Sequence, residues 1–254
     1  MKSYTVTATN WATSSENKIH DDTVARQFGF GGGLVPGVTL YAYLTRPIVE
    51  LWGAEWLDHG GAEVRFSSPV YDGTTIAAEL DPPRLELRDS AGSVCSSGSA
   101  WHDSRPVDVP DIGFAPLPTV RAEASSTSLA VGTLLGSIEH RFHVTQAATY
   151  LDIIGDDLDI YRSEGLAHPG WLLLDANQAL VANVVLGPWI HVGSRVHNLR
   201  PVTDGQLIST RSQVAAEYER KGHRFVELDI VTMADDEAAL VVRHTAIWRL
   251  RLPS

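Results

Sequence analysis

Two stretches, VRFSSPVYDG at Val64–Gly73 and VHNLRPVTDG at Val196–Gly205, share the letters V, PV and DG at identical spacing. Upstream of each stands a Pro-Gly pair that opens an apolar run, LVPGVTLYAYL at 34–44 and AHPGWLLLDANQAL at 167–180. The two Pro-Gly pairs are separated by almost the same number of residues as the two PV-x-DG signatures. Matched signatures at one separation are the mark of a duplicated unit. The chain is therefore predicted to contain two copies of one unit, fused head to tail.

Each copy is predicted to hold one buried helix followed by strands. The runs 38–52 and 171–186 are apolar on nearly all sides, which is typical of a helix buried on most of its faces. Pro47 should kink the first helix or end it early, and Gly187-Pro188 should stop the second. One helix wrapped by an antiparallel sheet, twice, is an α+β fold. Runs rich in β-forming residues between turn signals place the strands at 62–66, 74–80, 84–87 and 94–101, and at 193–199, 206–218, 224–232 and 239–250.

The segment between the two copies is rich in proline. Pro106, Pro110, Pro116 and Pro118 fall within 105–123, and such a segment cannot form a central strand. We therefore expect an N-terminal unit at 1–104, a linker at 105–125 and a C-terminal unit at 126–254.

Composition excludes several classes of function. The net charge of −11 disfavours nucleic acid as a partner. A single cysteine, Cys95, excludes a disulfide framework or a cysteine-type zinc site within the chain. His191, His197 and His244 lack metal-ligand spacing and are not expected to cluster. With neither a membrane-spanning run nor a signal sequence, we expect a cytoplasmic protein that acts on small or carrier-bound molecules, with no membrane partner.

Several of these stretches carry a family resemblance. The run ENKIHDDTVARQFGFGGGLVPGVTLYAYL at 16–44 resembles the hydratase motif of MaoC-like enoyl-CoA hydratases, in which D-x-N-P-x-H precedes a loop and a helix-opening glycine. AHPGWLLLDANQAL is similar to the helix of carrier-protein dehydratases and of polyketide synthase dehydratase domains. The resemblance implies a double hotdog fold, with two tandem units that each wrap a long helix in an antiparallel sheet. It also implies an acyl thioester of CoA or of a carrier protein as substrate, and no cofactor.

The same resemblance assigns roles to individual residues. His20 stands at the position of the motif histidine and Asn17 at that of its asparagine, but the motif aspartate is replaced by Ser15. The usual acid-base pair within one half is therefore broken. Asp175 stands where the carrier-protein dehydratases keep their acid, on the helix of the opposite half. The resemblance thus implies one composite site, His20 with Asp175. The pseudo-equivalent pair, Tyr161 with Ala42, would be inactive.

Physical chemistry allows two interpretations of Asp175, one catalytic and one structural. A carboxylate within an apolar helix is costly to bury without a partner, and burial raises its pKa, which suits a general acid. Alternatively, Asp175 pairs with Asn177, Gln178 or a backbone group and only holds the helices together. Gly37, at the start of the first helix, can offer its N–H to a thioester carbonyl, or can simply permit close packing. We expect Asn17, Pro36, Gly170 and Trp171 to contact the substrate.

The sequence therefore predicts an acyl-thioester dehydratase or (R)-type enoyl-thioester hydratase. His20 would remove the Cα proton during dehydration, Asp175 would protonate the departing β-hydroxyl, and Gly37 would hold the carbonyl. Two alternatives stay open. One is other chemistry on the same scaffold, by a thioesterase, an isomerase or a cyclase. The other is a catalytically silent subunit that binds acyl groups beside an active partner. The fused chain can form the whole site alone, and a homodimer is compatible with it.

Overall fold

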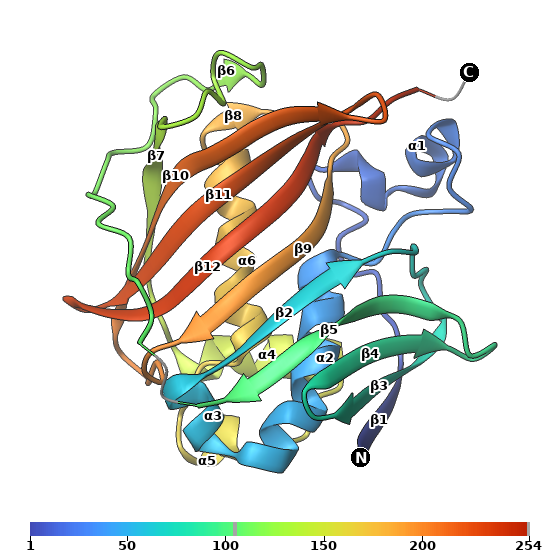
Figure 1. The fold of residues 1–254 in the computed structure, drawn as a ribbon, viewed down its shortest axis with the longest axis vertical. Coiled ribbons are helices and arrows are strands. Elements are labelled where there is room, and N and C mark those ends of the chain that lie inside the picture. The colour runs from blue at the N-terminus through green and yellow to red at the C-terminus, as the bar shows by residue number, and fades with distance from the viewer. Residues whose placement is uncertain (104–105, 253–254) are drawn as a thin grey trace.

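The computed structural model describes residues 1–103 and 106–252. Strands of the first copy are β1 (Lys2–Thr7), β2 (Gly60–Phe66), β3 (Thr75–Asp81), β4 (Arg84–Asp89) and β5 (Val94–His102). Strands of the second copy are β7 (Leu134–Arg141), β9 (Ile190–Asn198), β10 (Leu207–Arg220), β11 (His223–Ala234) and β12 (Glu237–Arg249). They form one ten-stranded sheet in the order β1-β3-β4-β5-β2-β9-β12-β11-β10-β7 (Figure 1). The copies join where β2 pairs antiparallel with β9, from Gly61↔His197 to Arg65↔Gly193.

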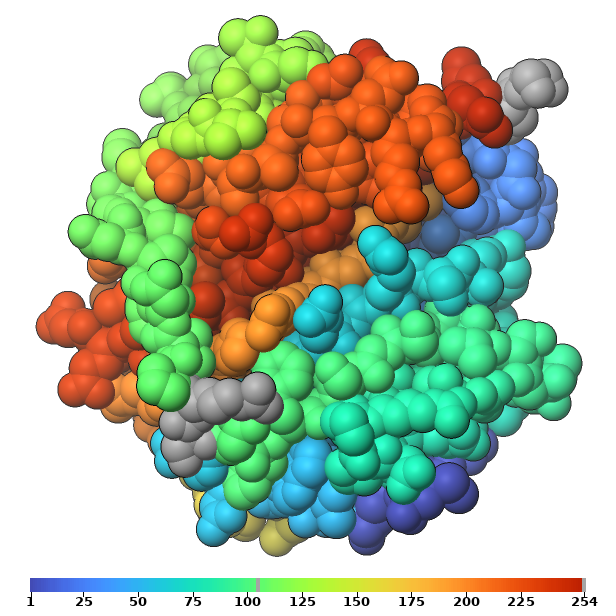
Figure 2. Space-filling model, viewed as in Figure 1, coloured from blue at the N-terminus to red at the C-terminus, as the bar shows by residue number. Residues whose placement is uncertain are grey.

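Two central helices lie side by side on one face of this sheet (Figure 1). They are α2 (Gly37–Trp52) and α6 (Pro169–Val181). A Cβ added at Gly170 would lie 2.5 Å from the Cβ of Ala42, so glycine is what lets the helices approach this closely. On the opposite side, the strands of both copies form a continuous surface over the helices (Figure 2). The smaller helices are η1 (Lys18–His20), α1 (Asp22–Gln27), α3 (Ala54–His59), α4 (Val144–Ile154) and α5 (Ile160–Ser163).

The repeated PV-x-DG stretches occupy equivalent places in the two copies. Leu34 forms a bridge with Tyr71 in the first copy, and Leu166 forms the matching bridge with Thr203 in the second. In each copy the bridge ties the loop before the central helix to the turn before a strand. The turn glycines have φ of +74° at Gly73 and +87° at Gly205, a conformation that favours glycine. The repeat therefore encodes the same turn twice.

All eight predicted strands are present, and α2 covers the range predicted for the first helix, whereas the second helix is shorter than predicted. The second helix ends at Val181, earlier than predicted, because Val184–Val185 (β8) pairs in parallel with Ala122–Glu123 (β6). Pro47 does not end α2, which continues to Trp52. An interior proline costs about 3 kcal/mol in a helix. Most of α2 is buried, Pro47 included, and burial of its apolar side chains offsets that cost.

The proline-rich segment is fastened to the second copy. Ser137 of β7 donates its N–H to the carbonyl of Ala115 at 2.8 Å, and Ala115 donates its N–H to the Ser137 hydroxyl at 3.2 Å. The expected boundary between residues 104 and 105 lies outside the described residues. The part of the linker that is described runs as an ordered strap along β7.

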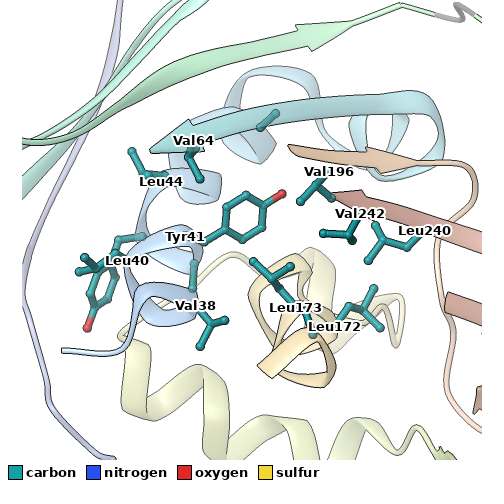
Figure 3. Close-up of a cluster of buried hydrophobic side chains, with 14 of the residues drawn as sticks. Val38, Leu40, Tyr41, Leu44, Val64, Leu172, Leu173, Val196, Leu240 and Val242 are labelled. Carbon is teal, nitrogen blue, oxygen red and sulfur yellow. The ribbon is translucent and has the colours of Figure 1, made fainter. Parts of the chain in front are cut away.

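Both copies contribute to one hydrophobic core (Figure 3). Tyr41 of α2 points between the helices and the sheet, with Leu173 of α6 and Val196 of β9 beside it in Figure 3. Its side chain is fully buried. The loop that carries His20 packs through a separate small cluster, in which Ile19, Ala25 and Leu34 lie against Ile190 of the second copy.

Candidate active site

His20 lies on η1, where Asn17 ties the first copy to the second. The Asn17 side chain accepts the Ile19 N–H at 3.3 Å and so caps η1. The same amide donates to the Trp189 carbonyl at 2.9 Å and accepts the Trp189 N–H at 3.2 Å. Asn17 is buried and uses both ends of its amide in these contacts. It thereby fixes His20 against the segment that leads into β9.

The hydrogen bonds of His20 set its tautomer. Nδ1 lies 2.7 Å from the carbonyl oxygen of Leu34, and a carbonyl can only accept, so Nδ1 carries the proton. Nε2 is then the unprotonated nitrogen, 3.4 Å from the side-chain nitrogen of Asn17. Burial lowers the pKa of His20 below its ordinary value, and the bond to Leu34 opposes this shift. His20 is therefore a neutral imidazole whose Nε2 can accept a proton.

The glycine-rich loop at 28–37 supports His20. Gly31 donates its N–H to the Tyr71 hydroxyl at 2.9 Å, and Gly33 donates to the Asp22 carboxylate at 2.8 Å. Leu34 returns its N–H to the carbonyl of Ile19 at 3.2 Å. These N–H groups of the loop therefore already have acceptors within the protein. A Cβ at Gly33 would lie 2.1 Å from the His20 carbonyl oxygen, so the loop needs glycine there.

Two cavities of about 230 Å³ each meet at His20. The first is mostly apolar and runs beside the start of α2; the second opens along α6. His20, Asn17, Pro36, Asn177 and Trp189 line both. Other first-cavity residues are Ile19, Phe30, Leu34, Val35, Gly37, Leu40, Phe66, Ser67, Ser68, Pro69, Val70, Ile190, His191, Val192 and Ile247. Other second-cavity residues are Trp11, Ala12, Ser15, Glu16, Val38, Leu174, Gln178 and Val181.

The face of α6 that reaches these cavities does not include Asp175. Leu174, Asn177, Gln178 and Val181 line the second cavity, and their spacing of three and four residues defines one helix face. Asp175 is absent from the lining of both cavities. Residues two apart on a helix point about 200° apart. The structure thus brings Asn177, rather than Asp175, to the cavities at His20.

Asp175 instead pairs with residues of its own copy. Its carboxylate lies 2.8 Å from His140 Nε2 on β7 and accepts the Thr210 hydroxyl of β10 at 3.1 Å. Trp171 packs edge-on against the His140 ring, with 5.1 Å between ring centres. These contacts favour the alternative in which Asp175 holds helix to sheet, with His140 and Thr210 as partners. The composite pair of His20 with Asp175 stays a prediction without support from these contacts.

The His140–Asp175 pair makes stability depend on pH. The hydrogen bond that His140 donates to the Asp175 carboxylate raises the pKa of His140, with burial opposing, so folding favours the protonated ring. This contribution is fully present below the unfolded pKa of about 6.5 and is lost as the pH rises through the raised folded pKa. We expect His140→Ala to lower the free energy of unfolding by about 2 kcal/mol near pH 6, because buried Asp175 loses its charged partner. Urea unfolding of both proteins across the pH range checks this, and a loss that grows with rising pH would contradict it.

Gly37 opens α2 beside the first cavity, and no side chain caps this helix. Its N–H group can therefore serve a ligand, and the helix dipole there favours negative charge. A Cβ on Gly37 would lie 2.7 Å from His191 Nδ1, so the tight-packing role expected for this glycine holds as well.

His191 is part of a buried polar chain that the sequence did not suggest. Its Nε2 lies 2.8 Å from the Ser194 hydroxyl, which lies 3.1 Å from His244 Nδ1. The two rings stack 4.2 Å apart, so the expectation that these histidines do not cluster is wrong. The cause is the pairing of β9 with β12, which sets Ser194 opposite His244. Burial lowers the pKa of His191, and lowers that of His244 to about 3, so both rings are neutral.

Two further findings concern residues 1–103 and 106–252. No group of three or more histidine, cysteine, aspartate or glutamate side chains there is arranged to hold a metal ion. None of the helices in that part of the chain is long and apolar enough to cross a membrane.

No family model and no curated protein matches this chain. Solved structures match over nearly all of it. A protein assigned as a MaoC-domain dehydratase from Chloroflexus aurantiacus J-10-fl superposes with a TM-score of 0.64 at 11% identity, covering 98% of this chain and 94% of that one. A MaoC-like dehydratase gives 0.60 at 13% identity, with 99% and 98% covered. RV0216 of Mycobacterium tuberculosis, described as having a double hotdog fold, gives 0.61 at 14% identity, with 96% and 93% covered.

The chain has the double hotdog fold. The resemblance to MaoC-like and double hotdog proteins is therefore confirmed at the level of structure. At these identities the likeness establishes the fold, and a fold alone does not determine an activity.

The two helix starts of the double hotdog differ. In the second unit, Gly170 donates its N–H to His168 Nδ1 at 2.9 Å, so the amide that corresponds to Gly37 is already occupied. His168 Nε2 in turn lies 3.1 Å from the buried Asp156 carboxylate, and Tyr161 packs against the His168 ring. Of the two pseudo-equivalent helix starts, the one at Gly37 is without a side-chain cap.

Of the residues predicted for the site, His20, Asn17, Pro36 and Gly37 lie together in the first cavity. Asp175, Gly170 and Trp171 line neither cavity. Asn177, Trp189 and His191 are among the cavity residues that the sequence prediction did not assign to the site. An i, i+3, i+4, i+7 pattern from Leu174 to Val181 was the one available signal for Asn177.

Proposed function

We propose that this double hotdog chain is a hydratase or dehydratase of acyl thioesters carried by CoA or by a carrier protein. One observation carries the proposal: the neutral imidazole of His20, whose unprotonated Nε2 lies 3.4 Å from the Asn17 amide nitrogen, lines an apolar cavity together with the uncapped start of α2. A base, an oxyanion site and an apolar wall are what α,β-elimination of water from an acyl thioester requires.

In dehydration, His20 Nε2 takes the Cα proton while negative charge develops on the thioester oxygen. The Gly37 N–H and the dipole of α2 stabilise that oxygen. The resulting imidazolium then gives its proton to the departing β-hydroxyl, which leaves as water. One imidazole performs both proton transfers, because Ser15 stands at the motif's acid position and a hydroxyl does not titrate near neutral pH. The Ser15 hydroxyl donates to the Asn17 carbonyl at 3.2 Å. Hydration is the reverse.

Hydrolysis of the thioester is the second candidate. Among the described residues that line the cavities, Glu16 is the one carboxylate, and its side chain is 53% exposed and paired with Arg121 at 2.9 Å. A lone base beside an oxyanion site also suits attack of water on the thioester carbonyl. That reaction would release the free thiol, whereas hydration leaves the thioester intact.

A single assay distinguishes these functions. Purified protein is mixed with 2-enoyl-CoA thioesters of short, medium and long chains, while the conjugated enoyl absorbance and the free thiol are followed together. The proposal predicts that the absorbance falls with no release of thiol. Release of thiol would replace it with hydrolysis, and no change on any chain length would favour a silent binding subunit.

A further inference from the structure

Three residues that line these cavities each carry a buried polar atom without a hydrogen-bond partner among the described residues. These atoms are Asn177 Oδ1, Trp189 Nε1 and His191 Nδ1. Buried polar atoms are normally satisfied, and one left without a partner at a site wall points to a ligand. Asn177 and Trp189 line both cavities together with His20.

Other polar side chains around His20 are already engaged. The Asn17 amide bonds both backbone groups of Trp189, and its nitrogen also lies 3.4 Å from His20 Nε2. The Ser15 hydroxyl donates to the Asn17 carbonyl. Glu16 pairs with Arg121. Asn177 is different, because its amide oxygen is without a partner and because it comes from the helix of the opposite copy.

Two side chains that line both cavities each carry a hydrogen-bond acceptor. His20 Nε2 carries a lone pair, because Nδ1 is committed to the Leu34 carbonyl, and the Asn17 amide nitrogen contacts it at the long distance of 3.4 Å. Asn177 Oδ1 is the second acceptor. A water molecule has two O–H donors and can satisfy both at once. We propose that Asn177 is a catalytic residue that accepts a hydrogen bond from the reacting water, or from the substrate β-hydroxyl in reverse, and holds it against His20. This inference rests on the proposed function and adds to it a residue from the second copy.

The step balances without a further reactant. In hydration, one O–H bond of the water breaks and its proton goes to His20 Nε2, while the oxygen bonds to Cβ. The π electrons of the Cα–Cβ bond move toward the thioester oxygen. The imidazolium then protonates Cα and the carbonyl reforms. The amide of Asn177 cannot take the proton, so it fixes the second O–H bond and leaves both transfers to His20.

Two substitutions on α6, Asn177→Leu and Asp175→Asn, are compared to test this role. We expect Asn177→Leu to lower kcat for enoyl-CoA hydration on the order of 10²-fold with little change in KM. Its resistance to urea should be equal to or greater than that of the wild type, because no intramolecular bond of the amide oxygen is lost. Asp175→Asn, two residues away, should keep kcat within about twofold and lose stability. Loss of turnover in folded Asp175→Asn, with Asn177→Leu fully active, would overturn the proposal.

A binding measurement separates this inference from the proposed function. A 3-hydroxyacyl-CoA should bind the wild type about fivefold tighter than the saturated acyl-CoA of equal length, and Asn177→Leu should lose that preference. If the wild type turns over no thioester, the proposed function fails, and the binding comparison still decides the role of Asn177. Equal affinity of the wild type for both ligands would overturn it.

Discussion

Replacing His20 with glutamine should lower kcat/KM for enoyl-thioester hydration about 10³-fold. The amide can still occupy the space of the ring and donate toward Leu34, but it cannot accept and return a proton. Because His20 performs both proton transfers in the proposed reaction, its loss removes both of them.

The matched control is His143→Gln. His143 precedes α4, its side chain is 43% exposed, and it lines neither cavity. Initial rates of the wild type, His20→Gln and His143→Gln are compared, and circular dichroism verifies that each protein is folded. Retention of full turnover in folded His20→Gln would remove His20 from the chemistry.

The second large effect is expected at Gly33, which touches no substrate. A Cβ there would lie 2.1 Å from the His20 carbonyl oxygen and 2.7 Å from its carbonyl carbon. Both atoms belong to the backbone, so either the loop or η1 has to move. We expect Gly33→Ala to lose about 2 kcal/mol of unfolding free energy and about 10²-fold in kcat/KM.

Gly187→Ala provides the comparison, because an added Cβ there has no neighbour within 4 Å. It should match the wild type in urea unfolding and in rate. If Gly33→Ala is as active and as stable as the wild type, the close approach of this loop to the His20 carbonyl does not position His20.

Much of the fold could be predicted from the repeat. The PV-x-DG turns and the Pro-Gly pairs mark the same two points in each copy, and the strands between turn residues follow from them. The two missed edge strands have weaker signals. Lys2–Thr7 alternates half-buried and exposed residues without a repeat partner, and Leu134–Arg141 contains Gly136, which weakens a strand pattern. Edge strands bury less and therefore show a weaker hydrophobic pattern.

Only the part of the candidate site whose residues lie close together in the sequence could be predicted. His20, Asn17 and Gly37 are close in sequence, and their arrangement depends on one loop and one helix start. The contribution of α6 depends on how that helix is rotated about its axis. Close contact of Gly170 with Ala42 and pairing of β2 with β9 set this rotation, and neither contact can be read from α6 alone. The sequence therefore pointed to Asp175, whereas the structure places Asn177 at the cavities.

The central claim is that His20 moves a proton at Cα of an acyl thioester, and isotope incorporation tests it most directly. A 2-enoyl-CoA is incubated with the wild-type protein in D₂O, the reaction is returned to H₂O, and the product is analysed by mass spectrometry. The account predicts a 3-hydroxyacyl-CoA that carries one carbon-bound deuterium at Cα. Recovery of unlabelled enoyl-CoA, or of free acid and CoA, would contradict it.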